Sequence, residues 1–204
     1  MKVKEIIAFA CSFIGEQEIV KKLTSTEAVS LTDKEQEKVD TLVRCFNLVN
    51  QEIASDYLPF LYTEEIDIDN SILNYADLDK TIINVYAVKG TFNRNVKYKA
   101  YTNYIQIFGK AKSITYSYLP DKSELDDDVE FFNGLSARIY AYGVASEYLL
   151  CDGLSEDAEI WEERFKESLF VLSRKRSELK LPARRWFWFF IKTLKSIRRQ
   201  PKKT

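Results

Sequence analysis

Acidic side chains gather between residues 121 and 130, where carboxylates could bind Mg²⁺ or Ca²⁺. The acids of this segment are Asp121, Glu124, Asp126, Asp127, Asp128 and Glu130. Their spacing does not match the ligand positions of an EF-hand loop, and the segment has no glycine. We therefore predict a solvated acidic loop that holds no metal.

The sequence contains no histidine, which excludes Ser-His-Asp and Cys-His nucleophilic sites, histidine general bases, and zinc or haem sites that need histidine. An enzyme would have to use carboxylates, lysines and tyrosines. The acids between Glu64 and Asp69 alternate along a predicted strand, so they point to opposite faces and are poorly placed for acid–base catalysis. We predict no catalytic residue, no cofactor and no enzymatic activity.

The three cysteines, Cys11, Cys45 and Cys151, are far apart and form no Cys-x-x-Cys pair. Each lies in a stretch whose apolar residues follow helical spacing. We expect three buried, reduced thiols rather than a disulfide framework or a metal site.

Tyrosines and lysines are interleaved between residues 97 and 118, as on a single-strand nucleic-acid platform, where aromatic faces stack on bases and cations contact phosphates. The residues concerned are Tyr98, Tyr101, Tyr104, Tyr116 and Tyr118 with Lys97, Lys99, Lys110 and Lys112. Because tyrosine in a strand more often belongs to a half-buried sheet, we favour a structural role for them.

The C-terminal residues 182–204 combine aromatic and basic side chains. The candidate docking segment is Arg184, Arg185, Trp186, Phe187, Trp188, Phe189, Phe190 and Ile191. As a helix it would suit a membrane surface, and as a strand it would suit insertion into the sheet or groove of another chain. One adjacent helix cannot shield six consecutive large apolar residues, so we predict a partner and favour a protein.

The formal net charge of −1 hides an uneven distribution. From Arg174 to Thr204 there are 12 Lys or Arg residues and one acid, whereas the rest of the chain has 18 bases and 30 acids. A body and a C-terminal segment of opposite charge face different partners.

The elements that must position these residues are helices at both ends and strands between them. Apolar spacing predicts helices over about 2–23, 32–57, 134–151 and 156–179. Gly15 is a candidate bend in the first, and Thr32 with Glu35 forms a capping-box pattern at the start of the second. Small residues between 141 and 146 would allow close packing of the third helix.

Between about residues 61 and 119 the period changes to alternation in short segments, which predicts an antiparallel meander. The expected fold class is therefore α+β, mainly α: a four-helix core with a small antiparallel β insertion between the second and third helices, and an extended C-terminal tail. We assign residues 1–181 to one domain and residues 182–204 to the docking tail.

Several of these features resemble the head-to-tail connector, or adaptor, proteins of tailed bacteriophages. Pro59 ends the second helix and leads into the strand at 64–68. Residues 140–153 (YAYGVASEYLLCDG) are similar to the Tyr-x-x-Gly-small-x-x-x-Tyr-Leu…Gly helix that follows the insertion in such proteins. Residues 158–165 are similar to the Ala-x-x-Trp-x-x-x-Phe start of their last helix. The resemblance covers residues 1–180.

The resemblance implies a structural virion protein, made in the host cytoplasm and located in the neck. Such adaptors form a ring, typically dodecameric, beneath the portal and pass double-stranded DNA to the tail. The implied partners are the portal protein, other copies of the chain, a tail or second neck protein, and the DNA. Residues 184–191 would dock on the portal, and the acidic loop 121–130 would line the channel or a subunit interface.

Two rival interpretations stay open. The basic aromatic tail could bind a membrane surface, and the lysine–tyrosine sheet could bind nucleic acid. No stretch reaches the roughly 18 apolar residues of a membrane span. In the favoured interpretation the protein binds no membrane.

Overall fold

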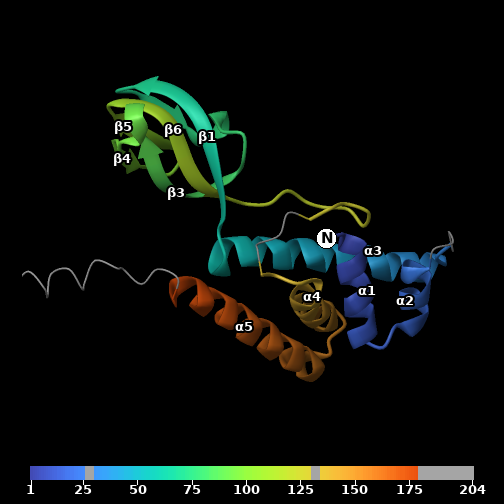
Figure 1. The fold of residues 1–204 in the computed structure, drawn as a ribbon. Coiled ribbons are helices and arrows are strands. Elements are labelled where there is room, and N and C mark those ends of the chain that lie inside the picture. The colour runs from blue at the N-terminus through green and yellow to red at the C-terminus, as the bar shows by residue number, and fades with distance from the viewer. Residues whose placement is uncertain (26–29, 130–133, 179–204) are drawn as a thin grey trace, which may run out of the picture.

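The computed structural model describes residues 1–25, 30–129 and 134–178, with side chains described up to Arg174. Helices at the two ends of this range form one body, and a β part that follows α3 and precedes α4 stands away from it (Figure 1). The fold class is α+β, as predicted. Each part has its own hydrophobic core.

The first predicted helix is two helices in the structure. The sequence predicts one helix over 2–23, but α1 (Val3–Phe13) and α2 (Gln17–Thr24) are separate, and the prediction of a single helix is wrong. The break lies at Gly15, whose φ of +87° falls in the left-handed region that glycine adopts without strain. Apolar residues of both helices still reach the same core.

The second predicted helix begins at its capping box. Glu35 donates its backbone N–H to Oγ1 of Thr32 at 3.4 Å, and Thr32 donates its own N–H to the Glu35 carboxylate at 2.7 Å. Lys22 of α2 forms an ion pair with Glu35 at 2.6 Å. This helix, α3 (Asp33–Glu52), continues as a π-helical turn, η1 (Ile53–Tyr57), instead of remaining α-helical to residue 57.

The Glu35 cluster predicts a pH dependence of stability. The ion pair with Lys22 and the hydrogen bonds from Thr32 lower the pKa of Glu35 from 4.5 to about 2. The ionised carboxylate therefore stabilises the folded state above about pH 4.5, and this contribution is lost as the pH falls towards 2. Urea unfolding at several pH values should show a flatter acid limb for Glu35→Gln than for wild type. Identical limbs would contradict the assignment.

Three helices meet at Gly143. The last two helices are α4 (Ala137–Cys151) and α5 (Ser155–Glu178), and α4 packs against α1, α3 and α5. A Cβ atom on Gly143 would lie 2.8 Å from Cγ1 of Val49 in α3 and 3.1 Å from the ring of Phe165 in α5. The small residues of α4 thus allow the close packing that the sequence predicts.

Aromatic and polar contacts tie α4 to its neighbours. The buried Tyr140 hydroxyl donates to Oδ1 of Asn50 in α3 at 3.1 Å, and burial raises the pKa of Tyr140. The ring of Tyr142 stacks on Phe13 of α1 and Trp161 of α5, with centroids 5.2 and 5.7 Å apart. These contacts fix α5 on the body with one face turned outward.

The β part consists of two three-stranded antiparallel sheets. Its strands are β1 (Phe60–Asp69), β2 (Ile72–Asn74), β3 (Ile82–Lys89), β4 (Lys97–Ala100), β5 (Tyr104–Phe108) and β6 (Lys110–Tyr118). The sheet orders are β1-β6-β3 and β2-β5-β4. The predicted meander is wrong, because β1 pairs with the last strand, β6, and not with its sequence neighbour.

Residues of both sheets share the β core. Its members include Leu73, Val88, Ile105, Ile107, Ile114 and Tyr116. Tyr98 reaches from β4 to β3 and donates its hydroxyl to the Val85 carbonyl at 3.2 Å. Tyr116 donates to Oε2 of Glu64 at 2.7 Å, and burial raises the pKa of Tyr116. The side chains that this core leaves out form the outer faces of the sheets.

Two of the three cysteines are buried. Cys11 and Cys45 lie in the helical core, as predicted, and burial raises the pKa of each thiol to about 12. Cys151, at the end of α4, is exposed, so the prediction of a third buried thiol is wrong. Cys151 is the last residue of α4 and lies at the protein surface, although Tyr148 and Leu149 of the same turn are buried.

This difference predicts the thiol reactivity of the folded protein. With DTNB at pH 8, Cys151 should react fast, while Cys11 and Cys45 react only as fast as the protein unfolds. Denaturant should release all three thiols in one fast phase. A Cys151→Ser variant should lose the fast native phase, and persistence of that phase would contradict the assignment.

Candidate interaction surfaces

The acidic segment lies along the helical body. The predicted docking residues 184–191 and Glu130 are outside the described residues. The remaining predicted acids are described and exposed: Asp121, Glu124, Asp126, Asp127 and Asp128. Their segment follows β6 and passes the start of α1, where Lys2 and Asp128 form an antiparallel bridge. The structure therefore places these carboxylates together on one strip of surface.

Hydrogen bonds fix the path of this segment. Lys4 of α1 donates its backbone N–H to the Leu125 carbonyl at 2.9 Å. Ser123 donates its N–H to Oδ1 of Asn47 at 2.8 Å and accepts from Nδ2 of the same side chain at 3.0 Å. The segment is thus held to both α1 and α3.

The carboxylates themselves turn outward. Asp121 forms an ion pair with Lys80 at 3.4 Å, and the Asp127 carboxylate accepts the Glu124 N–H at 2.7 Å. Across the described ranges, no three acidic or cysteine side chains converge as a metal site would require. The segment offers a fixed acidic strip that can repel or attract a charged partner.

The tyrosines of the considered nucleic-acid platform do not share one surface, because some belong to the β core and others lie outside it. Tyr116 and Tyr118 are buried, and the Tyr98 hydroxyl donates a hydrogen bond to a backbone carbonyl of β3. The favoured structural role is therefore correct for these three. Tyr101 and Tyr104 differ, because their rings stack on each other outside the core with centroids 4.7 Å apart.

Strand pairing collects the remaining aromatic and basic side chains on the outer face of the β2-β5-β4 sheet. Lys97 pairs with Phe108, and Lys99 pairs with Gln106, so all four point to the same side. Nζ of Lys99 lies 5.0 Å from the centre of the Tyr101 ring, a cation–π contact.

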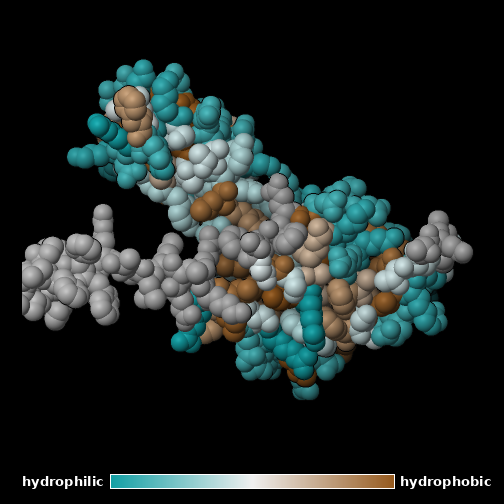
Figure 2. All heavy atoms as spheres, viewed as in Figure 1, coloured by the Kyte–Doolittle hydropathy of each residue, from teal (hydrophilic) through white to brown (hydrophobic). Residues whose placement is uncertain are grey.

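We call this set the aromatic-basic face. Its members are Ile72, Lys97, Lys99, Tyr101, Tyr104 and Phe108. Ile72 and Phe108 are 52 % and 50 % exposed. Figure 2 shows that the visible side of the β part is mostly hydrophilic, with a few hydrophobic residues among the polar ones.

A second surface runs along α5. The inner stripe of this helix consists of Ala158, Trp161, Phe165, Leu169 and Leu172. The outer side exposes Ile160 (52 %), Phe170 (64 %) and Val171 (50 %), which recur at helical spacing. Glu156, Glu163 and Glu167 share that side and are exposed.

We call this set the acidic face of α5: Glu156, Ile160, Glu163, Glu167, Phe170 and Val171. Sequence reasoning missed it, because only the apolar stripe with the strongest periodicity was used to place the helix. The signal was present, since Ile160 and Phe170 lie out of phase with that stripe by about half a turn.

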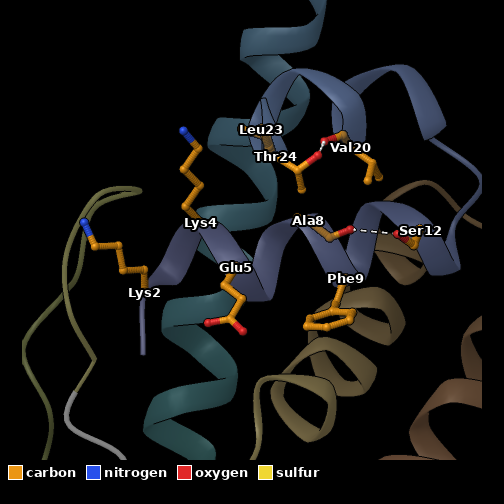
Figure 3. A pocket seen from close by; sticks show the side chains of 9 residues that line it. All are labelled: Lys2, Lys4, Glu5, Ala8, Phe9, Ser12, Val20, Leu23 and Thr24. Atoms are coloured by element: carbon orange, nitrogen blue, oxygen red, sulfur yellow. Dashed lines mark hydrogen bonds between the residues drawn. The ribbon is translucent and has the colours of Figure 1, made fainter. Parts of the chain in front are cut away.

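An apolar hollow of the body lies between α1 and α2, with a volume of about 440 Å³ (Figure 3). Its lining hydroxyls are occupied, because Ser12 donates to the Ala8 carbonyl at 3.0 Å and Thr24 donates to the Val20 carbonyl at 2.8 Å. The Lys4 side chain extends from α1 away from Glu5 and Phe9 (Figure 3). The polar groups that line this hollow do not converge on one point, as those of a catalytic or small-molecule site would.

Comparisons with known proteins do not assign a function, so the functional proposal depends on the surfaces described above. No family model matches the sequence, and a search of curated proteins found no match. Among the described helices, none combines the length and hydrophobicity required to cross a bilayer.

Proposed function

We propose that the protein is a non-enzymatic structural component of a tailed-bacteriophage virion, a head-to-tail adaptor that forms a ring beneath the portal and passes DNA to the tail. The resemblance in the sequence gives this class. The finer description belongs to the same proposal: a four-helix core, in which α1 and α2 take the place of one helix, and a C-terminal docking tail.

The observation that carries the proposal is the separation of two unlike surfaces on one chain. The β part follows α3, precedes α4 and projects from the body, carrying the aromatic-basic face with it. The acidic face of α5 lies on the body. Each presents apolar side chains that a neighbouring molecule could cover.

The acidic strip along residues 121–128 supports a role near DNA. In an assembled ring, exposed carboxylates on the channel wall would repel phosphates and keep the DNA from adhering. Its anchoring to α1 and α3 would hold these charges in place as DNA passes.

Electron microscopy and light scattering of the purified full-length protein, alone and mixed with a candidate portal, test this function. We expect rings or ring-forming oligomers, and docking on the portal that is lost in a version ending at Leu181. A chain that stays monomeric at high concentration with and without portal would overturn the proposal. Portal binding that survives the truncation would reject the docking role of the tail.

Nucleic-acid binding is the second candidate, favoured by the stacked Tyr101 and Tyr104 with Lys99 beside them. Single-stranded DNA should then bind with an affinity that falls steeply with salt and survives removal of residues 182–204. A membrane role of the tail predicts instead that vesicle flotation depends on residues 184–204.

A further inference from the structure

We propose that the aromatic-basic face of one copy binds the acidic face of α5 on the next copy. The inference rests on the proposed function, because it names the surfaces through which the subunits of the ring would meet. It draws on described residues only and does not involve the C-terminal tail.

The charges of the two faces are opposite in sign and similar in spacing. Lys97 and Lys99 are two residues apart on β4, which separates their Cα atoms by about 6.7 Å. Glu163 and Glu167 are four residues apart on α5, a rise of about 6 Å along the helix axis. All four side chains are exposed, so two parallel ion pairs can form without rearrangement of either backbone.

Apolar residues flank both charge pairs. Phe108 lies opposite Lys97 in the sheet, and Tyr101 lies beneath the ammonium of Lys99. On α5, Ile160 precedes Glu163 by one turn, and Phe170 follows Glu167 by one turn. Pairing the faces would remove these side chains from water, which supplies most of the binding free energy, while the charges set the register.

A single copy cannot join its own two faces. In Figure 1 the strands β4 and β5 lie at the far end of the β part, and α5 lies along the opposite side of the helical body. Two different surfaces that meet between copies make a head-to-tail contact, which closes into a ring when the rotation from one copy to the next divides a full turn and otherwise extends as a filament. Such a contact is compatible with the cyclic assembly of the proposed function.

Two other occupants each match only one of the two faces. Nucleic acid matches the aromatic-basic face but is repelled by α5, and the basic tail matches α5 but is repelled by Lys97 and Lys99. A second copy matches both surfaces at once.

Charge reversal tests the contact in the full-length chain. Self-association of Lys97→Glu/Lys99→Glu, measured by analytical ultracentrifugation, should be weaker than wild type by about tenfold or more. Lys21→Glu/Lys34→Glu changes the net charge equally at exposed lysines of α2 and α3, and should shift association less than about threefold. Combining Lys97→Glu/Lys99→Glu with Glu163→Lys/Glu167→Lys should restore assembly to within about threefold of wild type. Circular dichroism checks that each variant is folded.

The outcomes separate this contact from the proposed function. Rings that persist unchanged in Lys97→Glu/Lys99→Glu overturn the contact but leave the adaptor function standing. Loss of single-stranded DNA binding in that variant with intact assembly also overturns it, because the face then serves nucleic acid. Loss of assembly in the version ending at Leu181 but not in Lys97→Glu/Lys99→Glu overturns it too, because assembly then depends on the C-terminal segment and not on this face. A monomeric wild type overturns both.

Discussion

Replacing Phe165 by alanine is expected to lower the free energy of unfolding of the helical body by about 4 kcal/mol. The side chain is 2 % exposed on α5 and fills the site where α3, α4 and α5 meet. Its ring packs against Gly143 of α4. Because Gly143 has no side chain, nothing there could fill the cavity that the alanine variant leaves. Tyr57 of η1 touches it edge-on, with centroids 6.2 Å apart, and would lose that contact as well.

Urea unfolding followed by circular dichroism measures this effect. The matched control is Phe170→Ala, the same substitution on the same helix at a side chain that is 64 % exposed. It should change the free energy of unfolding by less than about 0.5 kcal/mol. Similar losses in the two variants would mean that the outer side of α5 is covered in the free protein, and would contradict the acidic face as a free surface.

Local signals in the sequence were sufficient to place most of the helices. The Thr32–Glu35 capping box and the last helix, predicted over about 156–179 and found at Ser155–Glu178, are both present. Each depends on residues within a few positions of one another, so periodicity and capping chemistry contain the information. The prediction of one helix over 2–23 is wrong at Gly15, because the spacing of apolar residues alone does not distinguish a bend within one helix from a break between two helices.

The pairing of the strands could not be predicted in the same way. β1 and β6 are separated by about 40 residues, and their register depends on which faces both sheets bury. Alternation predicted most of the strands, though not the short β2, and it did not predict their partners. The roles of the tyrosines could not be predicted for the same reason, because only the strand pairing determines that Tyr116 faces the core while Tyr104 faces outward.

The candidate interaction surfaces follow from those non-local pairings. The aromatic-basic face exists because β4 and β5 place Lys97 beside Phe108, a juxtaposition that the sequence does not reveal. The acidic face of α5 could have been predicted from the sequence, because all of its residues lie on one helix and follow helical spacing. The acidic segment was predicted as a solvated loop, and its carboxylates are exposed, but its anchoring to α1 required the folded chain.

Substituting alanine for Gly90 should destabilise the β part by about 3 kcal/mol. Gly90 ends β3 with a φ of −101°, which alanine also adopts, so the cost is steric and not conformational. The added Cβ would lie 2.4 Å from the carbonyl oxygen of Lys110 and 3.0 Å from Cγ2 of Val96. The first of these is a backbone atom of β6, so no rotamer change can relieve the clash.

The displaced strands would be the ones that form the aromatic-basic face. Val96 directly precedes Lys97, and the chain enters β6 at Lys110 directly after Phe108 and one glycine. Hydrogen exchange should therefore accelerate in residues 88–97 and 107–111 of Gly90→Ala, with little change in α4. Thr91→Ala, an exposed neighbour, is the control and should stay within about 0.5 kcal/mol of wild type. Uniform acceleration through helices and strands would instead show that the two cores unfold as one unit, and that the β part cannot be perturbed independently of the body.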